Sequence, residues 1–170
     1  MSRLIEQVQV IDWLGIGPAD YDTDRTFDYI NVENYRRGLV IFSSGVGTAG
    51  DDWNFTIRQA DSVSGGNAKD ADIVPEYWIK QAATNLLAVP QFTRATQTED
   101  ALISGDGDSA EQVGLLLVEL DFTKLDHANG FSWLGGTATL DASGGSQYCM
   151  TTLVLYDPRY PQATALGALS

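Results

Sequence analysis

The sequence predicts an all-β protein, an antiparallel β-sandwich of the jelly-roll type with about eight short strands, long polar loops and extended terminal arms. Three observations support this fold class. In Trp53–Ala60 apolar side chains alternate with polar ones, which is the period of a strand with one buried face. The turn formers Ser64-Gly65-Gly66-Asn67 follow, and similar strand-and-turn units recur along the chain. Glycine supplies 17 of the 170 residues, as a fold with many tight turns requires.

Three further strands are expected before Trp53. The apolar run Val8–Leu14 predicts the first, and Phe27–Val32, which alternates between two faces, predicts the second. Tyr35–Gly38 predicts a turn into a short buried strand, Leu39–Phe42, and Gly45–Gly50 predicts the turn that follows it. Polar loops are expected at Ala19–Asp24, Ser62–Asp72 and Thr98–Glu111.

The second half of the chain is less regular at its start. Ile73–Ala88 is expected to be irregular because prolines bracket it, with short strands at Tyr77–Lys80 and Phe92–Gln97. Val113–Phe122 is a nearly continuous apolar run, which predicts a strand buried on both faces. The last two strands are expected at Phe131–Leu140 and Tyr148–Tyr156, followed by a tail.

Length and composition predict one domain over residues 1–170, with an N-terminal arm of about residues 1–10 and a C-terminal arm of about residues 160–170. A hydrophobic fraction of 44% is enough for a packed core. Cys149 is the only cysteine, so no intrachain disulfide can form, which fits synthesis in a reducing cytoplasm.

The charge balance excludes some partners. Ten basic against 23 acidic residues give a net charge of −13, which repels nucleic-acid backbones and anionic lipid surfaces. The longest apolar run, Val113–Val118, is far shorter than the roughly 20 residues of a membrane span. We therefore expect neither nucleic acid nor a membrane as a partner.

Two motifs suggest ligands but lack the necessary context. Gly45–Gly50 matches G-x-G-x-x-G, yet two aspartates and a strand follow it where a dinucleotide site needs a helix, so we expect a hairpin loop. Asp20, Asp22 and Asp24 are spaced as in a calcium loop, but Arg25 replaces the required glycine. A second acidic cluster comprises Asp106, Asp108 and Glu111. Solvated acidic turns are the expected structure of both, and no metal or other cofactor is predicted.

No catalytic residue is predicted. His127 is the only histidine and is expected in an exposed turn, and no G-x-S-x-G motif marks a nucleophilic serine. Cys149 lies in an apolar strand, where a thiol is usually inert. Trp53 and Trp133 lie in strand patterns and are expected in the core, whereas Trp13 and Trp78 are candidate sugar platforms. We expect a protein that is not an enzyme.

Several motifs recur together along the chain: the D-D-W-x-F-T strand that begins at Asp51 and the Gly-Gly-x-x-Lys turn, the Tyr77–Ala83 stretch with the F-T-x-x-T-Q strand Phe92–Gln97, Val118–Asp121 with Leu125-Asp126, and the closing Val154–Tyr160. In these motifs the chain resembles small virion proteins from the head-gene region of tailed bacteriophages. The resemblance spans about Ile41–Tyr160 and carries no catalytic residue. It implies a capsid decoration (cement) protein that clamps neighbouring major capsid subunits, commonly as a homotrimer, on the outer surface of the virion.

Two alternatives to this function remain at this stage. One is a tail or tube component, or another virion structural protein. The other is a carbohydrate-binding module for attachment to a host, which would use an exposed tryptophan such as Trp13 or Trp78. In the leading hypothesis the partners are the major capsid protein and further copies of this chain.

Overall fold

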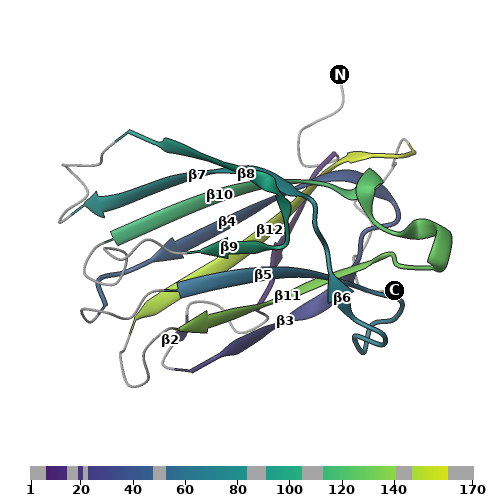
Figure 1. Ribbon diagram of the computed structural model, residues 1–170, viewed down its shortest axis with the longest axis horizontal. Helices are drawn as coiled ribbons and strands as arrows, with labels where there is room; N and C mark the ends of the chain where they lie inside the picture. Colours follow the sequence, from purple (N-terminus) through teal and green to yellow (C-terminus); the bar gives the residue numbers. More distant parts are fainter. Residues whose placement is uncertain are drawn as a thin grey trace.

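In the computed structural model the chain forms two antiparallel β-sheets packed face to face (Figure 1). The structure describes residues 7–14, 19–20, 23–47, 53–83, 91–104, 113–140 and 147–160. The predicted β-sandwich is therefore confirmed, although the described residues contain twelve strands, several of them only two to four residues long, in place of about eight.

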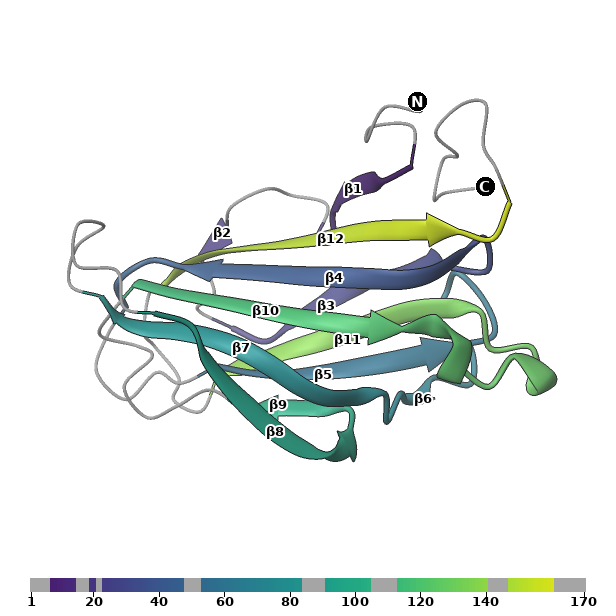
Figure 2. The same cartoon turned by 90° about the horizontal axis from the view of Figure 1, so that it is seen from above.

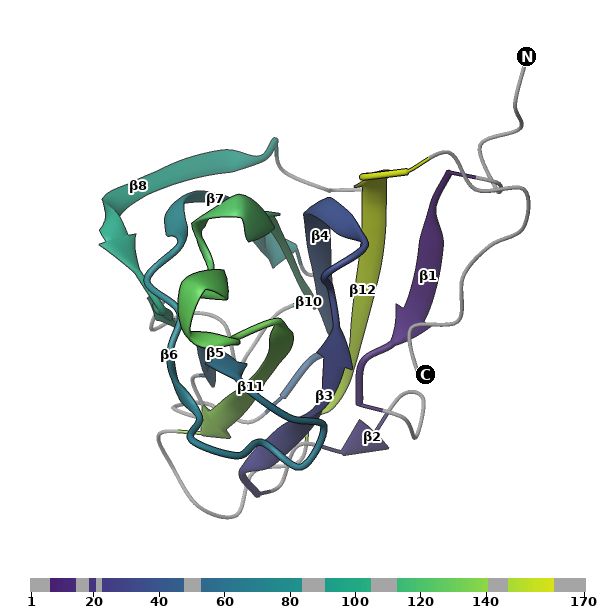
Figure 3. The same cartoon turned by 90° about the vertical axis from the view of Figure 1, so that its right-hand side faces the viewer.

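The larger sheet forms one layer of the sandwich. Its strands follow the order β1-β12-β4-β10-β7-β8, and β2 pairs with β12 beside this path (Figures 1 and 3). The bounds are β1 Gln9–Asp12, β2 Ala19–Asp20, β4 Tyr35–Ser44, β7 Val74–Ala83, β8 Thr93–Asp100, β10 Val113–Asp121 and β12 Tyr148–Pro158.

The smaller sheet forms the second layer, with the order β3-β11-β5-β6 and with β9 paired to β5. Its bounds are β3 Arg25–Asn31, β5 Trp53–Ala60, β6 Lys69–Asp70, β9 Leu102–Ser104 and β11 Trp133–Leu140. Two 3-10 turns, η4 (Phe122–Lys124) and η5 (His127–Asn129), connect β10 to β11 at one end of the molecule (Figure 2).

The strand order identifies the topology as a jelly roll. The consecutive strands β1, β3, β4 and β5 alternate between the larger and the smaller sheet. The strands β9, β10, β11 and β12 alternate between the two sheets in the same way. The resulting order is β1-β12-β4-β10 in one sheet and β3-β11-β5-β9 in the other, the double-sheet arrangement of eight strands. The β7–β8 hairpin is an addition that extends the larger sheet beyond β10.

Aromatic side chains from both sheets fill the core. The ring of Phe42 on β4 lies 4.4 Å from that of Phe55 and 4.8 Å from that of Trp53, both on β5. Phe27 on β3 continues the stack, 5.9 Å from Phe55 and 4.9 Å from Trp13. These five side chains are at most 2% exposed, so they contribute much of the hydrophobic stabilisation of the sandwich.

The chain joins the two sheets along both long sides. On one side Trp13 donates its backbone N–H to Thr151 O of β12 and its indole N–H to Asp28 O of β3, 2.9 Å away. The Asp28 N–H in turn donates to Trp13 O. On the other side the chain passes from β8 to β9 through the buried Ala101, whose carbonyl accepts from the Ile57 N–H of β5.

The turn predicted at Tyr35–Gly38 is wrong, because β4 already begins at Tyr35 and runs to Ser44. The turn was predicted from Gly38, because glycine is common in turns. Gly38 lies in mid-strand because a Cβ there would come within 2.4 Å of the ring of Phe122, so only glycine lets that ring pack on β4. The chain instead turns before Tyr35, whose N–H donates to Val32 O.

The irregular structure predicted for Ile73–Ala88 is also wrong over its described part. β7 runs through Val74–Ala83, and an irregularity in its pairing with β8 between Val74 and Glu76 accommodates Pro75. The three predicted polar loops contain the short strands β2, β6 and β9, and Thr98–Asp100 belongs to β8. Residues 84–90 and 105–112 lie outside the described residues.

The predicted strand Tyr77–Lys80 lies inside β7, and Phe92–Gln97 corresponds to β8, which ends three residues later. The other predicted strands are found with bounds shifted by up to two residues at either end, and Trp53–Ala60 matches β5 at both ends. β12 extends two residues into the predicted tail, to Pro158. Of the predicted arms, Gln9 and Val10 lie in β1, whereas residues 1–6 and 161–170 are outside the described part of the chain.

Candidate functional site

The two outward-facing surfaces of the sandwich differ in chemistry. Outward positions of a sandwich sheet are normally polar, because they face water. The smaller sheet follows this rule in its middle, although the exposed Leu102, which pairs with Thr56, and the half-buried Trp133 also lie on its outer side. Its paired outward residues are Asn54 with Thr139, Thr56 with Thr137, and Thr137 with Thr26. We call the surface formed by Thr26, Asn54, Thr56, Thr137 and Thr139 the polar face.

The larger sheet breaks the rule. One row of directly paired outward residues runs Val10–Val154–Leu39 and ends at Glu119. The next runs Thr152–Ile41–Leu117–Trp78 between Asp12 at one end and Arg94 at the other. A third row joins Met150, Ser43 and Leu115. We call the surface formed by Val10, Leu39, Ile41, Trp78, Leu115, Leu117, Met150 and Val154 the apolar face.

The apolar face lies on the open side of the larger sheet. Val10 is 62% exposed and Met150 40%, while the other six side chains are half-buried by their neighbours in the sheet. Among the described strands, those of the smaller sheet all lie on the opposite side of the larger sheet (Figure 3). Apolar side chains gathered over five strands and left in contact with water indicate a surface for association.

A charged cluster marks one end of this face. Glu119 of β10 accepts hydrogen bonds from Arg37 Nη1 of β4 at 2.9 Å and from the Tyr156 hydroxyl of β12 at 2.6 Å. The Tyr156 hydrogen bond, aided by Arg37, lowers the pKa of Glu119. Burial, together with the same hydrogen bond, raises the pKa of Tyr156 to about 12. The cluster therefore holds one paired carboxylate at neutral pH and offers no group that titrates near pH 7.

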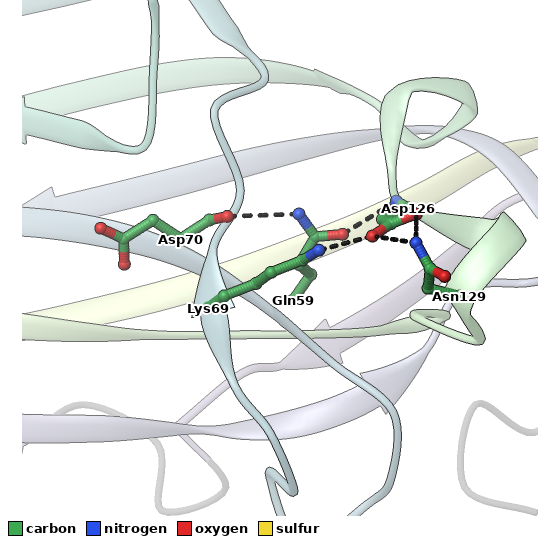
Figure 4. A network of polar contacts seen from close by, with 5 residues as sticks. All are labelled: Gln59, Lys69, Asp70, Asp126 and Asn129. Carbon is green, nitrogen blue, oxygen red and sulfur yellow. Dashed lines mark hydrogen bonds and ion pairs between the residues drawn. The ribbon is translucent and has the colours of Figure 1, made fainter.

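A second polar network fixes the η4–η5 connection to the smaller sheet (Figure 4). The Gln59 amide, only 7% exposed, donates to Asp70 O at 3.2 Å, and its oxygen accepts the Asp126 N–H at 2.9 Å. The Asp126 carboxylate accepts from Lys69 Nζ at 2.5 Å and from Asn129 Nδ2. Every polar group named here forms a hydrogen bond with another member of the network, so the network has a structural role. The Asp126 carboxylate is already hydrogen-bonded to Lys69 and Asn129 and is not free to act as an acid or a base.

Asp126→Asn is expected to loosen this corner and to change the acid stability of the protein. Lys69, and then Asn129, lower the pKa of Asp126 below its ordinary value of 3.8. The ionised carboxylate therefore stabilises the fold above that pH, and this stabilisation is lost as the pH falls through the folded-state pKa. We expect the variant to melt a few degrees lower at pH 7 and to approach the wild type below pH 3.8, measured by thermal denaturation across pH.

Asp70→Asn is the matched control for this prediction. Asp70 contributes its backbone carbonyl to the network, while its exposed carboxylate lies 3.5 Å from Nε of the half-buried Arg58. The control should melt close to the wild type across the same pH range. An equal decrease in melting temperature in Asp126→Asn and Asp70→Asn would show that removal of any one negative charge lowers the stability. The contacts of Asp126 would then not be the cause.

His127 lies in the 3-10 turn η5, so the predicted turn is confirmed, but its side chain is half-buried and not exposed as predicted. Its Nε2 lies 2.8 Å from Phe122 O, and the Arg159 guanidinium is 3.5 Å away. Among the described residues its ring is thus engaged by a backbone carbonyl and a cation, and no hydrogen bond joins it to a serine or carboxylate.

Cys149 is buried, and burial raises the pKa of its thiol to about 12, which keeps it neutral and unreactive.

The predicted ligand motifs fall only partly within the described residues. Asp20 lies in β2, Asp24 is exposed before β3, and Asp22 is outside the described part. The cluster of Asp106, Asp108 and Glu111 is outside it as well, as are residues 48–50 of the glycine motif. Gly45 donates its N–H to Tyr148 O and so continues the β4–β12 pairing. No group of three or more metal-ligating side chains occurs within the described ranges.

The tryptophans are distributed differently from the prediction. Trp53 is in the core as expected, but Trp133 is only half-buried, on the outer side of the smaller sheet beside Asn31 and Ala60. Trp13 is fully buried, which rules it out as a sugar platform. Trp78 is half-buried at the β7 margin of the apolar face, between Leu117 of β10 and Arg94 of β8.

The apolar face itself was not predicted, although the sequence contained a signal for it. Leu115, Leu116, Leu117 and Val118 are consecutive, so both sides of β10 had to be apolar. The run predicts a strand covered on both sides, whereas of these four residues only Leu116 and Val118 face the core. Leu115 and Leu117 face outward.

Comparisons with known proteins do not assign a family. No family model matches the chain, and no curated protein sequence matches it. Three solved structures that resemble the fold are a baseplate tripod of bacteriophage Tuc2009, the Yersinia pseudotuberculosis-derived mitogen and an empty capsid of Triatoma virus. Their identities are 15%, 9% and 8%, and their TM-scores are 0.32, 0.29 and 0.29. The alignments cover 92%, 94% and 95% of this chain and 68%, 92% and 96% of the respective neighbours.

TM-scores of this size are too low to transfer a function from any of the three structures. The relationship to phage head decoration proteins therefore stays a prediction from sequence motifs. In the described part of the chain, no helix has the length and apolar character to cross a membrane.

Proposed function

We propose that this chain is a virion structural protein, a capsid decoration protein that binds the outer surface of a phage head and stabilises contacts between major capsid subunits. The observation that carries the proposal is the apolar face, in which eight apolar side chains gather on the outer side of the larger sheet, with Val10 and Met150 exposed and the other six half-buried. Such a surface favours work by association with other protein molecules.

Three further properties support this function over catalysis or nucleic-acid binding. His127 and Cys149, the two residues most able to supply a base or a nucleophile, are held by a backbone carbonyl and by burial. The net charge of −13 suits an outward-facing layer and disfavours contact with packaged DNA. Binding at many symmetry-related positions would let modest contacts add up to firm attachment.

The test is co-sedimentation of the purified protein with capsids that lack it, assembled from the major capsid protein encoded in the same genome. We expect saturable binding and a higher melting temperature of the decorated capsids, because a ligand that binds only the assembled shell stabilises it. A tail or tube component would instead leave capsids unbound and form rings or stacks on electron micrographs. Absence of both binding and thermal stabilisation would refute the decoration function.

A carbohydrate-binding module is less well supported after the burial of Trp13. Trp78 is only half-buried and pairs with Leu117 on one side and with Arg94 on the other, so it is the remaining candidate platform of the two. Binding of a glycan on an array, reduced by Trp78→Ala, would favour this alternative over the decoration function.

A further inference from the structure

We infer that a polar pocket at one end of the sandwich binds a sugar acid, that is, a small carboxylate that carries several hydroxyl groups. The pocket has a volume of about 270 Å³ and is lined by Glu33, His127, Gly130, Ser132 and Arg159. It is separate from the apolar face, and the proposed capsid binding does not use it.

Three segments that are distant in the sequence form this pocket. Glu33 lies in the turn between β3 and β4, His127 lies in η5, and Arg159 directly follows β12. The segments meet at the end of the molecule that carries the 3-10 turns (Figure 2). The Val32 N–H donates to Ser132 O at 3.0 Å and so ties the first segment to the residues after η5.

Arg159 is held in place by its backbone as well as by its side chain. Its N–H donates to Asn34 O at 2.9 Å, and its Nε donates to Tyr35 O at 3.4 Å. Two positions earlier, Asp157 has φ +55°, a conformation that costs free energy in residues other than glycine. Backbone strain of this kind persists where surrounding contacts maintain it, and it is frequent at binding sites. The guanidinium is therefore positioned at the pocket before a ligand arrives.

The charge of Arg159 has no carboxylate partner in the described part of the chain. Acidic residues outnumber basic ones by 23 to 10, and five of the described basic side chains form ion pairs, but Arg159 is not among them. Its Nη2 lies 3.5 Å from His127 Nε2. That nitrogen is 2.8 Å from Phe122 O, so it carries a proton and cannot also accept from Arg159. The guanidinium thus retains N–H donors for an anion.

The shape and charge of this site select a carboxylate among anions. The parallel N–H groups of a guanidinium match the two oxygens of a carboxylate in a bidentate pair. A phosphate or sulfate dianion suits the pocket less well, because Glu33 lines the same pocket and the chain carries −13 overall. One carboxylate on Arg159 balances one positive charge.

The rest of the lining selects hydroxyl groups. None of the described lining residues has an aliphatic side chain or a phenyl ring, so an apolar substituent on the ligand would find little to pack against. Neither the Ser132 hydroxyl nor the Glu33 carboxylate has a hydrogen bond or an ion pair within the described residues, and both can pair with ligand hydroxyl groups. A hexuronic acid, with one carboxylate and several hydroxyl groups, matches this lining.

The experiment is an NMR titration of the full chain, without a histidine tag, with D-glucuronate. His127 is the only histidine, so its ring gives one identifiable signal that reports on the pocket. We expect this signal to shift saturably with D-glucuronate. It should shift much less with D-glucose, which has hydroxyl groups but no carboxylate, and with acetate, which has a carboxylate but no hydroxyl group.

Two variants and a matched control test the named contacts. Arg159→Gln should weaken D-glucuronate binding at least about tenfold, because it removes charge-assisted hydrogen bonds. Ser132→Ala should weaken binding about threefold, through the loss of one neutral hydrogen bond to the ligand. Arg36→Gln is the control, since Arg36 is exposed on β4 and outside the pocket lining, and its replacement removes the same charge. The control should bind like the wild type.

Several results would overturn the inference. One is the absence of a saturable shift with D-glucuronate, and another is unchanged affinity in Arg159→Gln. If Arg159→Gln does not fold, wild-type affinity in Ser132→Ala decides against the pocket. Equal binding of acetate or sulfate would show a general anion site and no selection of a sugar acid. These titrations use the isolated protein, so their failure leaves the decoration function standing, and failed co-sedimentation with capsids leaves the pocket standing.

Discussion

Phe42→Ala is expected to lower the free energy of unfolding by about 3–5 kcal/mol, the usual cost of truncating a fully buried phenylalanine. Phe42 is 0% exposed and links the two sheets, with its ring 4.4 Å from Phe55 and 4.8 Å from Trp53. The truncation leaves a cavity that is lined by side chains of both sheets. A shift of one sheet alone cannot fill this cavity. Urea denaturation followed by tryptophan fluorescence measures the loss.

Thr56→Ala is the control for this truncation. Thr56 lies on β5 beside Phe55 but faces outward on the polar face. Its replacement should cost well under about 1.5 kcal/mol, because it opens no cavity in the core. Similar losses in Phe42→Ala and Thr56→Ala would contradict the assignment of Phe42 to the junction between the sheets.

Gly136→Ala is expected to lower the free energy of unfolding by about 2–3 kcal/mol, in the range of overpacked cores. A Cβ at position 136 would lie 2.6 Å from the carbonyl oxygen of Thr56 on the paired strand β5, and 3.2 Å from the ring of Phe27. The nearer atom belongs to the backbone, so relief requires β11 and β5 to move apart. Denaturant unfolding, with hydrogen exchange of the β5 and β11 amides, measures both effects.

Gly130→Ala separates this steric clash from the conformational cost of replacing glycine. Gly130 has φ +85° and nothing within 4 Å of an added Cβ, so its variant suffers only backbone strain of about 1–2 kcal/mol. Faster exchange of the β5–β11 amides is expected for Gly136→Ala alone. Unchanged exchange in that variant would show that the strands tolerate the methyl group.

The fold class was predictable because it rests on local patterns. The alternation of apolar and polar residues in Trp53–Ala60 depends only on which side of β5 faces the core. Both ends of this strand were therefore predicted correctly. β4 and β7 were misjudged where long-range packing overrides local preference. Gly38 is in a strand because of Phe122, which lies 84 positions away, and Pro75 is accommodated by an irregularity in the pairing of β7 with β8.

The candidate site was less predictable, because it depends on register. Leu117, Ile41 and Trp78 become neighbours only when β10 pairs with β4 on one side and with β7 on the other. The apolar character of each strand was visible in the sequence, but the side of the sheet that stays uncovered was not. The network around Asp126 was missed for the same reason, since Gln59 and Lys69 are 67 and 57 positions away.

The contacts of Trp13 with β3 also bear on behaviour at high concentration. A free strand edge invites another molecule to add a strand, and repeated addition produces open-ended fibres. Trp13 occupies both the N–H and the carbonyl of Asp28, the two groups that an incoming strand would need at the middle of β3. One buried tryptophan, through its indole N–H and its backbone carbonyl, therefore also protects this edge from polymerisation when many copies crowd together.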